Sequence, residues 1–589
     1  MSSSLTEAET EKFRTLFNVF DRRGDGKIDM IDLAMTMTSL ENWGEVVSGL
    51  SATTLMKEVD TNHDGSIEFD ELLKVMENAK QSGTNTGFAS VVEMVERATL
   101  LRDNTVKEDV RFAIINWINT VLANDTDLKD RLPVSTESDA FVTACHDGLL
   151  LCKLINIVVP NTIEERVLNK QDLTDVRIKE NNVLCIYSAR AIGCCVDEIK
   201  ATDLIQGNSQ VILGLAWQII QIGLFEKINL INHPELRRLL KDGETNDVLL
   251  RSTEDILLRW FNFHLHAAGH LRKVNNFTHD IKDSECYTIL LKQIAPKDVN
   301  LNKTLELLPE RRAELVLENA EKIGCRQFLR PRDIVSGSLK LNLAFVANLF
   351  NKYPALEPVD QAAITPETRQ ERIYRNWMNS LNTKPVINNL HEGCRDAIAP
   401  INIVDRIFPG LVDQKKVSYP PFRSEAKMIE NCDYLISLTK MVKYSVIGLL
   451  GPDIYNKNIY TLLSIVMQLM RSYYIVPLME GVKVPNEEGI LEMVNQKLKA
   501  KISGFNDTGL CTGRALLELI EAIRPGSVDQ SLVTSSGSAE DNLLNAKLAI
   551  SCARKIGAIV YAFPEDIVEV KAKVMLTIFA GVIAVERRN

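Results

Sequence analysis

The stretch 211-VILGLAWQIIQIGLFEKI-228 decides the fold, because it reads as a helix that is apolar on nearly every side. Its fifteen residues from Val211 to Phe225 include only two polar side chains, Gln218 and Gln221. A helix that is hydrophobic all round is buried, yet this one is shorter than the roughly 20 residues that a membrane helix needs. We therefore expect a core helix of a helical domain and no membrane insertion.

Similar apolar runs occur three more times, and each of the four follows an Asp that we place in a loop. The further runs are 341-LNLAFVANLF-350, 459-IYTLLSIVMQLM-470 and 574-VMLTIFAGVIAV-585. The four acids are Asp203, Asp333, Asp453 and Asp566. Two more landmarks keep the same order: a first helix with Trp117, Trp260, Trp377 or Met493, and a central helix that ends at Pro160, Pro296, Pro409 or Pro525.

Landmarks that advance together by about 110–140 residues indicate an internal repeat. Strand signals are nearly absent, so we expect an all-α protein with four compact helical repeats. We expect the three Trp rings to lie in the cores, because a large aromatic ring on an apolar helix face buries more area there than at a surface site.

The N-terminal region carries two loops of the calcium-binding type, 21-DRRGDGKIDMID-32 and 60-DTNHDGSIEFDE-71. An EF-hand loop needs oxygen ligands at positions 1, 3, 5, 7, 9 and 12, with Gly at position 6 for the turn. The second loop supplies them all, with Gly65 at the turn. Its predicted calcium ligands are Asp60, Asn62, Asp64, the backbone carbonyl of Ser66, Glu68 and Glu71.

The first loop departs from this pattern at two positions. Arg23 stands at position 3, and Asp32 at position 12 is one methylene shorter than the usual Glu. We therefore expect weak calcium binding or none from its remaining candidates, which are Asp21, Asp25, the carbonyl of Lys27 and Asp32. The loop would be retained because Ile28 packs against Ile67 in a paired EF-hand.

A linker (81–105) follows, and within it 88-FASVVEMVERATLLRD-103 has the spacing of an amphipathic helix. Two readings stay open. The helix packs on the first large domain, or it docks in the groove of the EF-hand pair and responds to calcium.

Composition excludes several classes of protein. Lys and Arg total 68 against 78 Asp and Glu, a net charge of −10, so nothing global favours nucleic acid. The eleven Cys include no C-x-x-C pair and fall mostly in apolar stretches, which is typical of reduced thiols. The start MSSSLTEAETEKF lacks the apolar segment of a secretory signal, which favours the cytoplasm. Common nucleotide, protease and hydrolase motifs are missing, so we expect no enzyme.

The repeats resemble calponin-homology domains, and two EF-hands followed by four such domains resemble the fimbrin (plastin) family. The similarity is carried by 241-KDGETNDVLLRSTEDILLRWFNFHL-265, 273-KVNNFTHDIKDSECY-287, 325-CRQFLRPRDIV-335 and 340-KLNLAFVANLFNKYPAL-356. The expected domains are the EF-hand pair (1–80), repeat 1 (106–228), repeat 2 (248–356), repeat 3 (366–475) and repeat 4 (485–589). The resemblance implies that repeats 1 and 2 (the first pair) and repeats 3 and 4 (the second pair) each form a tandem actin-binding domain.

A chain with two such pairs would bundle filamentous actin in the cytoskeleton under calcium control, as a monomer. The short connector 357-EPVDQAAITPET-368 suggests tight bundling. The alternative is a calcium-responsive signalling adaptor, or a microtubule-associated protein, that uses these domains for protein contacts. The Met493 that replaces Trp in repeat 4 leaves that repeat's role in actin binding open.

By the same resemblance, actin would contact the first and last helices of the first repeat in each pair and the first helix of the second repeat. The candidate residues are Arg111, Gln218, Gln221, Ile222, Lys457 and Arg471. The helix 209–225 also has apolar residues around more of its circumference than one core face requires, so part of it awaits a partner or is covered by the companion repeat.

Overall fold

The computed structural model describes most of the four repeats and part of the EF-hand pair. The described residues are 13–14, 17, 20, 27–29, 32–33, 52–82, 108–136, 140–241, 244, 252–299, 308–359, 366–382, 386–419, 422, 424–479 and 485–588. The predicted amphipathic helix at 88–103 and most of the first calcium loop, including Asp21 and Asp25, lie outside them.

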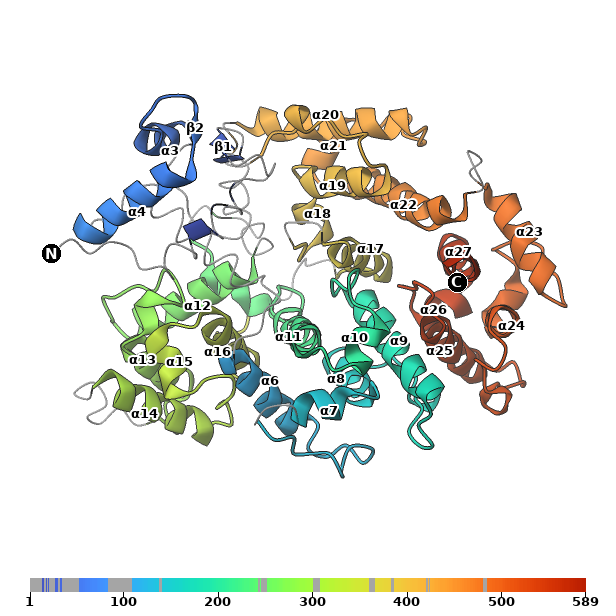
Figure 1. Ribbon diagram of the computed structural model, residues 1–589, viewed down its shortest axis with the longest axis horizontal. Helices are drawn as coiled ribbons and strands as arrows, with labels where there is room; N and C mark the ends of the chain where they lie inside the picture. Colours follow the sequence, from blue (N-terminus) through green and yellow to red (C-terminus); the bar gives the residue numbers. More distant parts are fainter. Residues whose placement is uncertain are drawn as a thin grey trace.

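The protein is all-α, as predicted, and the only strands among the described residues are β1 (Ile28–Asp29) and β2 (Ser66–Ile67). Figure 1 shows repeat 1 at the centre of the lower edge, between repeat 2 and repeat 4, with repeat 3 above it. The described helices of the EF-hand pair, α3 (Ala52–Val59) and α4 (Phe69–Ser82), lie at the upper left.

Among the described residues, the four repeats share five α-helices in the same order, and repeats 1 and 3 have one further short helix, α7 or α18, after the first. Repeat 1 contains α6 (Glu108–Val121), α7 (Ala140–Cys145), α8 (Leu149–Val158), α9 (Asp175–Ala191), α10 (Ala201–Ile205) and α11 (Ser209–Phe225). Repeat 2 contains α12 (Thr253–Ala267), α13 (Glu285–Ile294), α14 (Pro309–Lys322), α15 (Pro331–Ser336) and α16 (Leu339–Lys352). Repeat 3 contains α17 (Arg369–Ser380), α18 (Leu390–Gly393), α19 (Ile398–Ile407), α20 (Glu425–Met441), α21 (Gly451–Tyr455) and α22 (Ile459–Ile475). Repeat 4 contains α23 (Glu487–Lys497), α24 (Arg514–Ile523), α25 (Ala539–Lys555), α26 (Pro564–Val568) and α27 (Ala572–Arg588).

The four landmark Asp residues lie in the first turn of the short helices α10, α15, α21 and α26, which corrects the expectation that they lie in loops. In every repeat the Asp carboxylate accepts a hydrogen bond from the backbone N–H three residues earlier. The donors are Lys200 (2.8 Å), Arg330 (2.8 Å), Leu450 (3.0 Å) and Phe563 (2.9 Å). The acid satisfies an amide that the helix itself leaves without a partner, and so it fixes where the short helix begins.

The backbone then turns through a left-handed residue into the last helix of each repeat. These residues are Gly207, Gly337, Lys457 and Val570, with φ of 74°, 75°, 60° and 49°. The carbonyl of each Asp accepts the N–H of the residue that follows closely on the turn: Asn208, Ser338, Asn458 and Lys571. Gly adopts this conformation without strain, whereas a β-branched residue such as Val570 does so at a cost. The same corner therefore orients the last helix four times.

Repeats 1 and 2 pack through α11 and α16, with an aromatic cluster beside them. Phe328, which is buried in the loop before α15, lies between two Trp rings, with ring centroids 6.2 Å from Trp117 and 6.5 Å from Trp217. Trp260 and Trp377 are fully buried, as predicted. Trp117 is only partly buried: it packs against the core and stacks on Phe328 of the companion repeat, so it lies at the edge of the core of repeat 1.

Repeats 3 and 4 pack in the same way, through α22 and α27. Met467 stands where the first pair has Trp217, since each lies nine residues after the Asn that caps its helix. Tyr561 stands where the first pair has Phe328, five residues before the landmark Asp. Side chains that include Met467, Tyr374 and Tyr561 line a cavity of about 180 Å³ at this junction. The smaller Met side chain leaves this space unfilled.

The two pairs contact one another directly, through α9 of repeat 1 with α25 and α17 of the second pair. The polar contacts between repeat 1 and repeat 4 include Arg554 Nη1 to the Thr162 carbonyl (2.8 Å), the Glu164 N–H to Ser551 Oγ (2.9 Å), Lys555 Nζ to the Val167 carbonyl (3.2 Å) and Lys555 Nζ to Glu180 (3.1 Å). The sequence shows only a short connector, 357–368, between the pairs, whereas here packed helices also join them directly.

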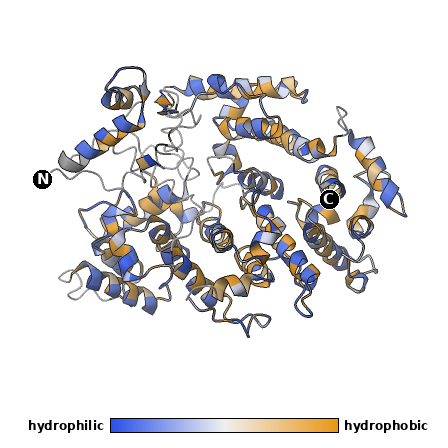
Figure 2. Ribbon diagram, in the orientation of Figure 1, coloured by the Kyte–Doolittle hydropathy of each residue, from blue (hydrophilic) through white to orange (hydrophobic). Residues whose placement is uncertain are grey.

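The segment Ile459–Leu478 is long and apolar enough, by length and composition alone, to cross a membrane. In this fold 44% of its most apolar window is buried, and Leu462, Ile465 and Val466 are in the core of repeat 3. We therefore read it as a core helix. Figure 2 shows hydrophobic and hydrophilic residues interspersed along most other helices, as in amphipathic helices that bury one face.

We predict that Met467→Trp stabilises the junction of repeats 3 and 4 by about 1 kcal/mol, because the larger ring fills the cavity as Trp217 does in the first pair. Hydrogen exchange of α22 and α27 in the full chain should slow by about fivefold. Met441→Trp is the matched control, since Met441 is 63% exposed and does not line the cavity. Faster exchange in Met467→Trp than in the control would contradict the prediction.

Candidate functional sites

The second calcium loop joins α3 to α4 and is held against the first loop by β1 and β2. The strands are antiparallel and pair Ile28 with Ile67 and Asp29 with Ser66. Both Ile side chains are completely buried, which confirms that the apolar position 8 of each loop packs against the other. Gly65 has φ of 85°, the left-handed conformation that position 6 of the loop requires.

The predicted ligands Asp60, Asn62 and Asp64 point into the loop and organise its backbone. Asp60 Oδ2 accepts the Gly65 N–H at 3.0 Å, and Asn62 Oδ1 accepts the Asp64 N–H at 2.9 Å. Asp64 Oδ1 accepts both the N–H (2.9 Å) and the hydroxyl (2.7 Å) of Ser66, and these bonds lower the pKa of Asp64. Asp60 Oδ1 is buried and has no hydrogen-bond partner among the described residues. A buried carboxylate oxygen in this state fits a cation ligand.

Glu71, the predicted position-12 ligand, is turned toward the backbone of its own loop. Oε1 accepts the Thr61 N–H (2.9 Å), the Thr61 hydroxyl (2.8 Å) and the Asn62 N–H (3.2 Å), while Oε2 accepts the Glu68 N–H (3.1 Å). Burial raises the pKa of Glu71, but these hydrogen bonds outweigh it, and the pKa lies below its ordinary value. The carboxylate is therefore ionised at neutral pH, and its contribution to stability is lost only as the pH falls through that lowered pKa.

The oxygen donors match the hard ligands that calcium prefers, and Asp60 and Glu71 are both largely buried. Within the described part of the chain, no three or more His, Cys, Asp or Glu side chains are gathered as a metal-binding group. The orientation of Glu71 accounts for this at the second loop. Binding would require Glu71 to exchange backbone donors for the ion.

The described part of the first loop is closed by its own carboxylates. The Asp32 N–H donates to Asp29 Oδ1 at 2.9 Å, and the Asp29 N–H donates to Asp32 Oδ2 at 3.1 Å. Lys27 Nζ reaches across to the second loop, where it lies 3.1 Å from Glu68 Oε1 and 3.5 Å from Asp64 Oδ2. The sequence was sufficient to predict this contact. When two antiparallel loops pair at position 8, position 7 of the first loop (Lys27) lies opposite position 9 of the second (Glu68).

Gln218, a predicted actin contact on α11, has a structural role. Its Oε1 accepts the Cys195 N–H at 2.9 Å and its Nε2 donates to the Cys195 carbonyl at 3.3 Å. Gln468 holds Ser445 in the same way in repeat 3. The half-buried Gln218 amide therefore clamps the loop after α9, and its contact with actin stays a prediction. Its equivalence to Gln468, 250 residues later, was the signal available in the sequence.

The rest of α11 is largely covered. Ile212, Leu215, Ile219 and Ile220 are buried, while Gln221 and Ile222 are half-buried. Since α11 packs on α16, the companion repeat accounts for much of the apolar surface that the sequence left open. Gln221 and Ile222 remain on the narrow stripe that reaches solvent, and their contact with actin stays a prediction.

Arg111 lies on α6, close to the junction with repeat 2. Its side chain is partly exposed and lies 3.9 Å from Glu108. The neighbouring Asp109 accepts hydrogen bonds from Arg330 (2.6 Å) and Arg332 (3.1 Å) of repeat 2. The start of α6 is thus tied to the companion repeat, and Arg111 borders that contact.

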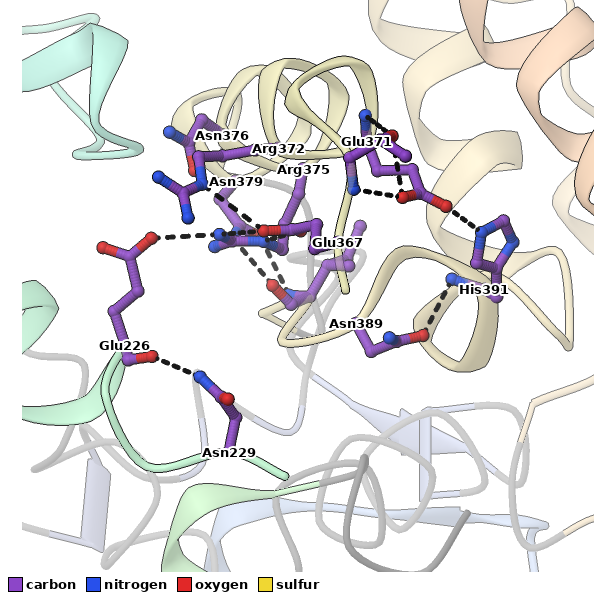
Figure 3. Close-up of polar contacts among 12 residues, drawn as sticks. Glu226, Asn229, Glu367, Glu371, Arg372, Arg375, Asn376, Asn379, Asn389 and His391 are labelled. Carbon is purple, nitrogen blue, oxygen red and sulfur yellow. Dashed lines mark hydrogen bonds and ion pairs between the residues drawn. The ribbon is translucent and has the colours of Figure 1, made fainter. Parts of the chain in front are cut away.

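Helix α17, the first helix of repeat 3, faces repeat 1 rather than open solvent. Figure 3 shows Arg375 directed at both Glu367 and Glu226, where Glu226 follows α11; the closest distances are 2.7 Å and 3.1 Å. On the same helix Asn376 donates to the Ala191 carbonyl at 3.2 Å. These contacts extend the joint between the two pairs from α25 to α17.

Lys457 and Arg471 lie near opposite ends of α22, so the structure does not bring them together. Lys457 is the left-handed corner residue before the helix, and its Nζ lies 3.3 Å from Glu392. Arg471 reaches Glu487 of repeat 4 at 3.7 Å. Tyr460, in the first turn of α22, is 82% exposed and was not among the predicted contacts. A large aromatic side chain this exposed is a candidate for partner binding.

Comparison with known families matches the whole series of domains. The EF-hand domain pair matches residues 10–77, and the calponin homology (CH) domain matches four times, at 108–224, 251–355, 368–475 and 485–588. We refer to the repeats as CH domains from here on.

Full-length relatives and a solved structure agree with this assignment. Fimbrin of Dictyostelium discoideum is 52% identical, over 99% of each chain, and plastin-3 of Danio rerio is 41% identical, over 98% of each chain. The crystal structure of the actin-crosslinking core of Schizosaccharomyces pombe fimbrin matches with a TM-score of 0.71 and 38% identity, over 81% of this chain and all of that one. With the EF-hand pair and four CH domains in the same order, this chain belongs to the fimbrin/plastin family.

Proposed function

We propose that this protein cross-links actin filaments into bundles, with one filament site on each CH-domain pair, and that calcium binding to the EF-hand pair regulates it. The solved relative is named for actin crosslinking, and this chain covers all of that core. The proposed role is structural rather than enzymatic. It places the protein in the cytoplasm, on the actin cytoskeleton, and needs no dimer, because each chain carries two pairs.

The observation that carries the proposal is the direct joint between the pairs. α9 packs on α25 and α17, and the joint includes Lys555 with Glu180 and Arg375 with Glu226. Two filament sites held by packed helices have a defined separation, whereas two sites on a flexible tether have a wide range of separations. A fixed separation suits parallel, closely spaced filaments.

Within each pair we assign actin contact to surfaces that the fold leaves accessible. In the first pair these are Arg111 on α6 and the stripe with Gln221 and Ile222 on α11. In the second pair, α17 is partly covered by repeat 1, so we assign the contact chiefly to α22, with Lys457, Tyr460 and Arg471 as candidates. Met493 of repeat 4 is half-buried on α23 and adds no evidence for a contact there.

For calcium, the second loop is the proposed site. Asp60, Asn62, Asp64, Glu68 and Glu71 would supply side-chain oxygens, together with the Ser66 carbonyl. A bound ion would supply two positive charges to offset part of the charge of the four carboxylates, and Glu71, which accepts backbone N–H groups of the loop here, would have to give up some of those hydrogen bonds to bind it. The first loop contributes the β1 pairing, and weak binding or none.

Filament binding and bundling can be separated by sedimentation with filamentous actin, each with calcium and with chelator. We expect the protein to pellet with actin at high speed and to carry actin into the low-speed pellet, with a difference between calcium and chelator. Pelleting at high speed alone would leave one working site per chain. No pelleting with actin, or pelleting with microtubules instead, would overturn the proposal and favour an adaptor.

The calcium site is tested by Glu71→Gln, which removes one charge and one carboxylate oxygen from position 12. We expect calcium affinity, measured by titration calorimetry on the full chain, to fall at least about tenfold. Glu77→Gln on α4 removes the same charge from a residue outside the loop and should leave affinity within twofold. Equal affinities for the two variants would assign calcium to a different site.

The joint between the pairs is tested by Lys555→Glu, which places a carboxylate beside Glu180 and removes the donor to the Val167 carbonyl. At equal amounts of protein bound to actin, the low-speed pellet should fall by about half or more, because the separation of the sites is no longer fixed. Lys501→Glu reverses an exposed charge in the same CH domain and serves as the control. A result like that of Lys501→Glu would mean that the joint has no part in bundling.

A further inference from the structure

The pairing of β1 with β2 brings a lysine of the first loop to the ligands of the second. In this antiparallel ladder Ile28 is opposite Ile67, so the next pair outward is Lys27 with Glu68. Residues directly opposite on one face of a sheet have side chains in contact range. The register of the two loops therefore determines where the Lys27 side chain lies.

The Lys27 ammonium lies among three groups of the second loop. Its Nζ is 3.1 Å from Glu68 Oε1, 3.5 Å from Asp64 Oδ2 and 3.5 Å from Ser66 Oγ. A lysine ammonium is charged throughout the neutral range, so the contacts with Glu68 and Asp64 are ion pairs. Asp64 and Glu68 stand at positions 5 and 9 of the loop, and both are proposed calcium ligands.

We propose that Lys27 is a tethered cation that competes with calcium for the carboxylates of Asp64 and Glu68 and so weakens calcium binding at the second loop. The inference rests on the proposed calcium site at 60–71. The oxygens of Asp64 and Glu68 that face the ammonium are among those that calcium would use, and two cations at the same carboxylates repel one another. The lysine must therefore withdraw when calcium binds, and the free energy of its two ion pairs is subtracted from that of calcium binding.

The size of the effect follows from the exposure of the pair. The Lys27 and Glu68 side chains are 47% and 49% exposed, so each ion pair is a surface interaction of modest strength. Two such pairs correspond to a change in calcium affinity of roughly three- to tenfold. Competition of this size would change the calcium concentration at which the EF-hand pair responds. It is too small to determine whether the pair folds.

The test is calcium titration by calorimetry on the full chain, comparing wild type with Lys27→Gln, Lys27→Arg and Lys57→Gln. Lys57 is an exposed lysine on α3, so Lys57→Gln controls for the change in net charge of the EF-hand pair. We expect Lys27→Gln to bind calcium about three- to tenfold more tightly than wild type. Lys27→Arg and Lys57→Gln should stay within about twofold of wild type, the first because it keeps the competing charge.

Other outcomes are equally informative. If Lys27→Gln matches Lys57→Gln, or binds calcium more weakly than wild type, Lys27 is not a competitor and the inference is wrong. If wild type and all variants bind no calcium, the proposed calcium site itself fails. A second measurement uses Glu68→Gln as the background: the gain from Lys27→Gln should shrink there, because one of the two competed carboxylates is gone, and an undiminished gain would contradict direct competition.

Discussion

The rest of the structure depends on the hydrogen bond between a buried or half-buried Asp carboxylate and the backbone amide three residues before it. This bond begins a short helix, and the left-handed residue after that helix sets the direction of the last helix in each CH domain. The last helices α11, α16, α22 and α27 then make the contacts within each pair. One local interaction, used four times, thus determines how the domains face one another.

The joint between the two pairs has a different character, because it is polar. Arg554 is buried at this joint, and burial lowers its pKa to about 10. Its guanidinium donates to the Val560 carbonyl within its own domain and to the Thr162 carbonyl across the joint. If the two pairs separate, water can replace the Thr162 carbonyl as an acceptor for Arg554. Opening a polar joint therefore requires less free energy than opening an apolar core.

Much of this could be predicted from the sequence where the pattern is local. The loop 60–71, the helical repeats and the buried Trp260 and Trp377 follow from spacing and periodicity. The rest depends on contacts between distant residues. Trp117 has the same apolar helical setting as Trp260, yet it packs on the companion domain, and the landmark Asp residues required backbone geometry to be recognised as helix starts. The joint of α9 with α25 is formed by mixed polar faces, which carry no distinctive pattern.

The joint also changes what the connector 357–368 has to do. When two modules are held by a tether, its length controls their effective concentration and the range of positions they sample. Here the faces of α9, α17 and α25 already hold the pairs in place, and the described end of the connector takes part, because Glu367 pairs with Arg375 of α17. The residues that fix the arrangement of the pairs are therefore distant in the chain, as in the contact of Arg554 with Thr162, which are 392 residues apart.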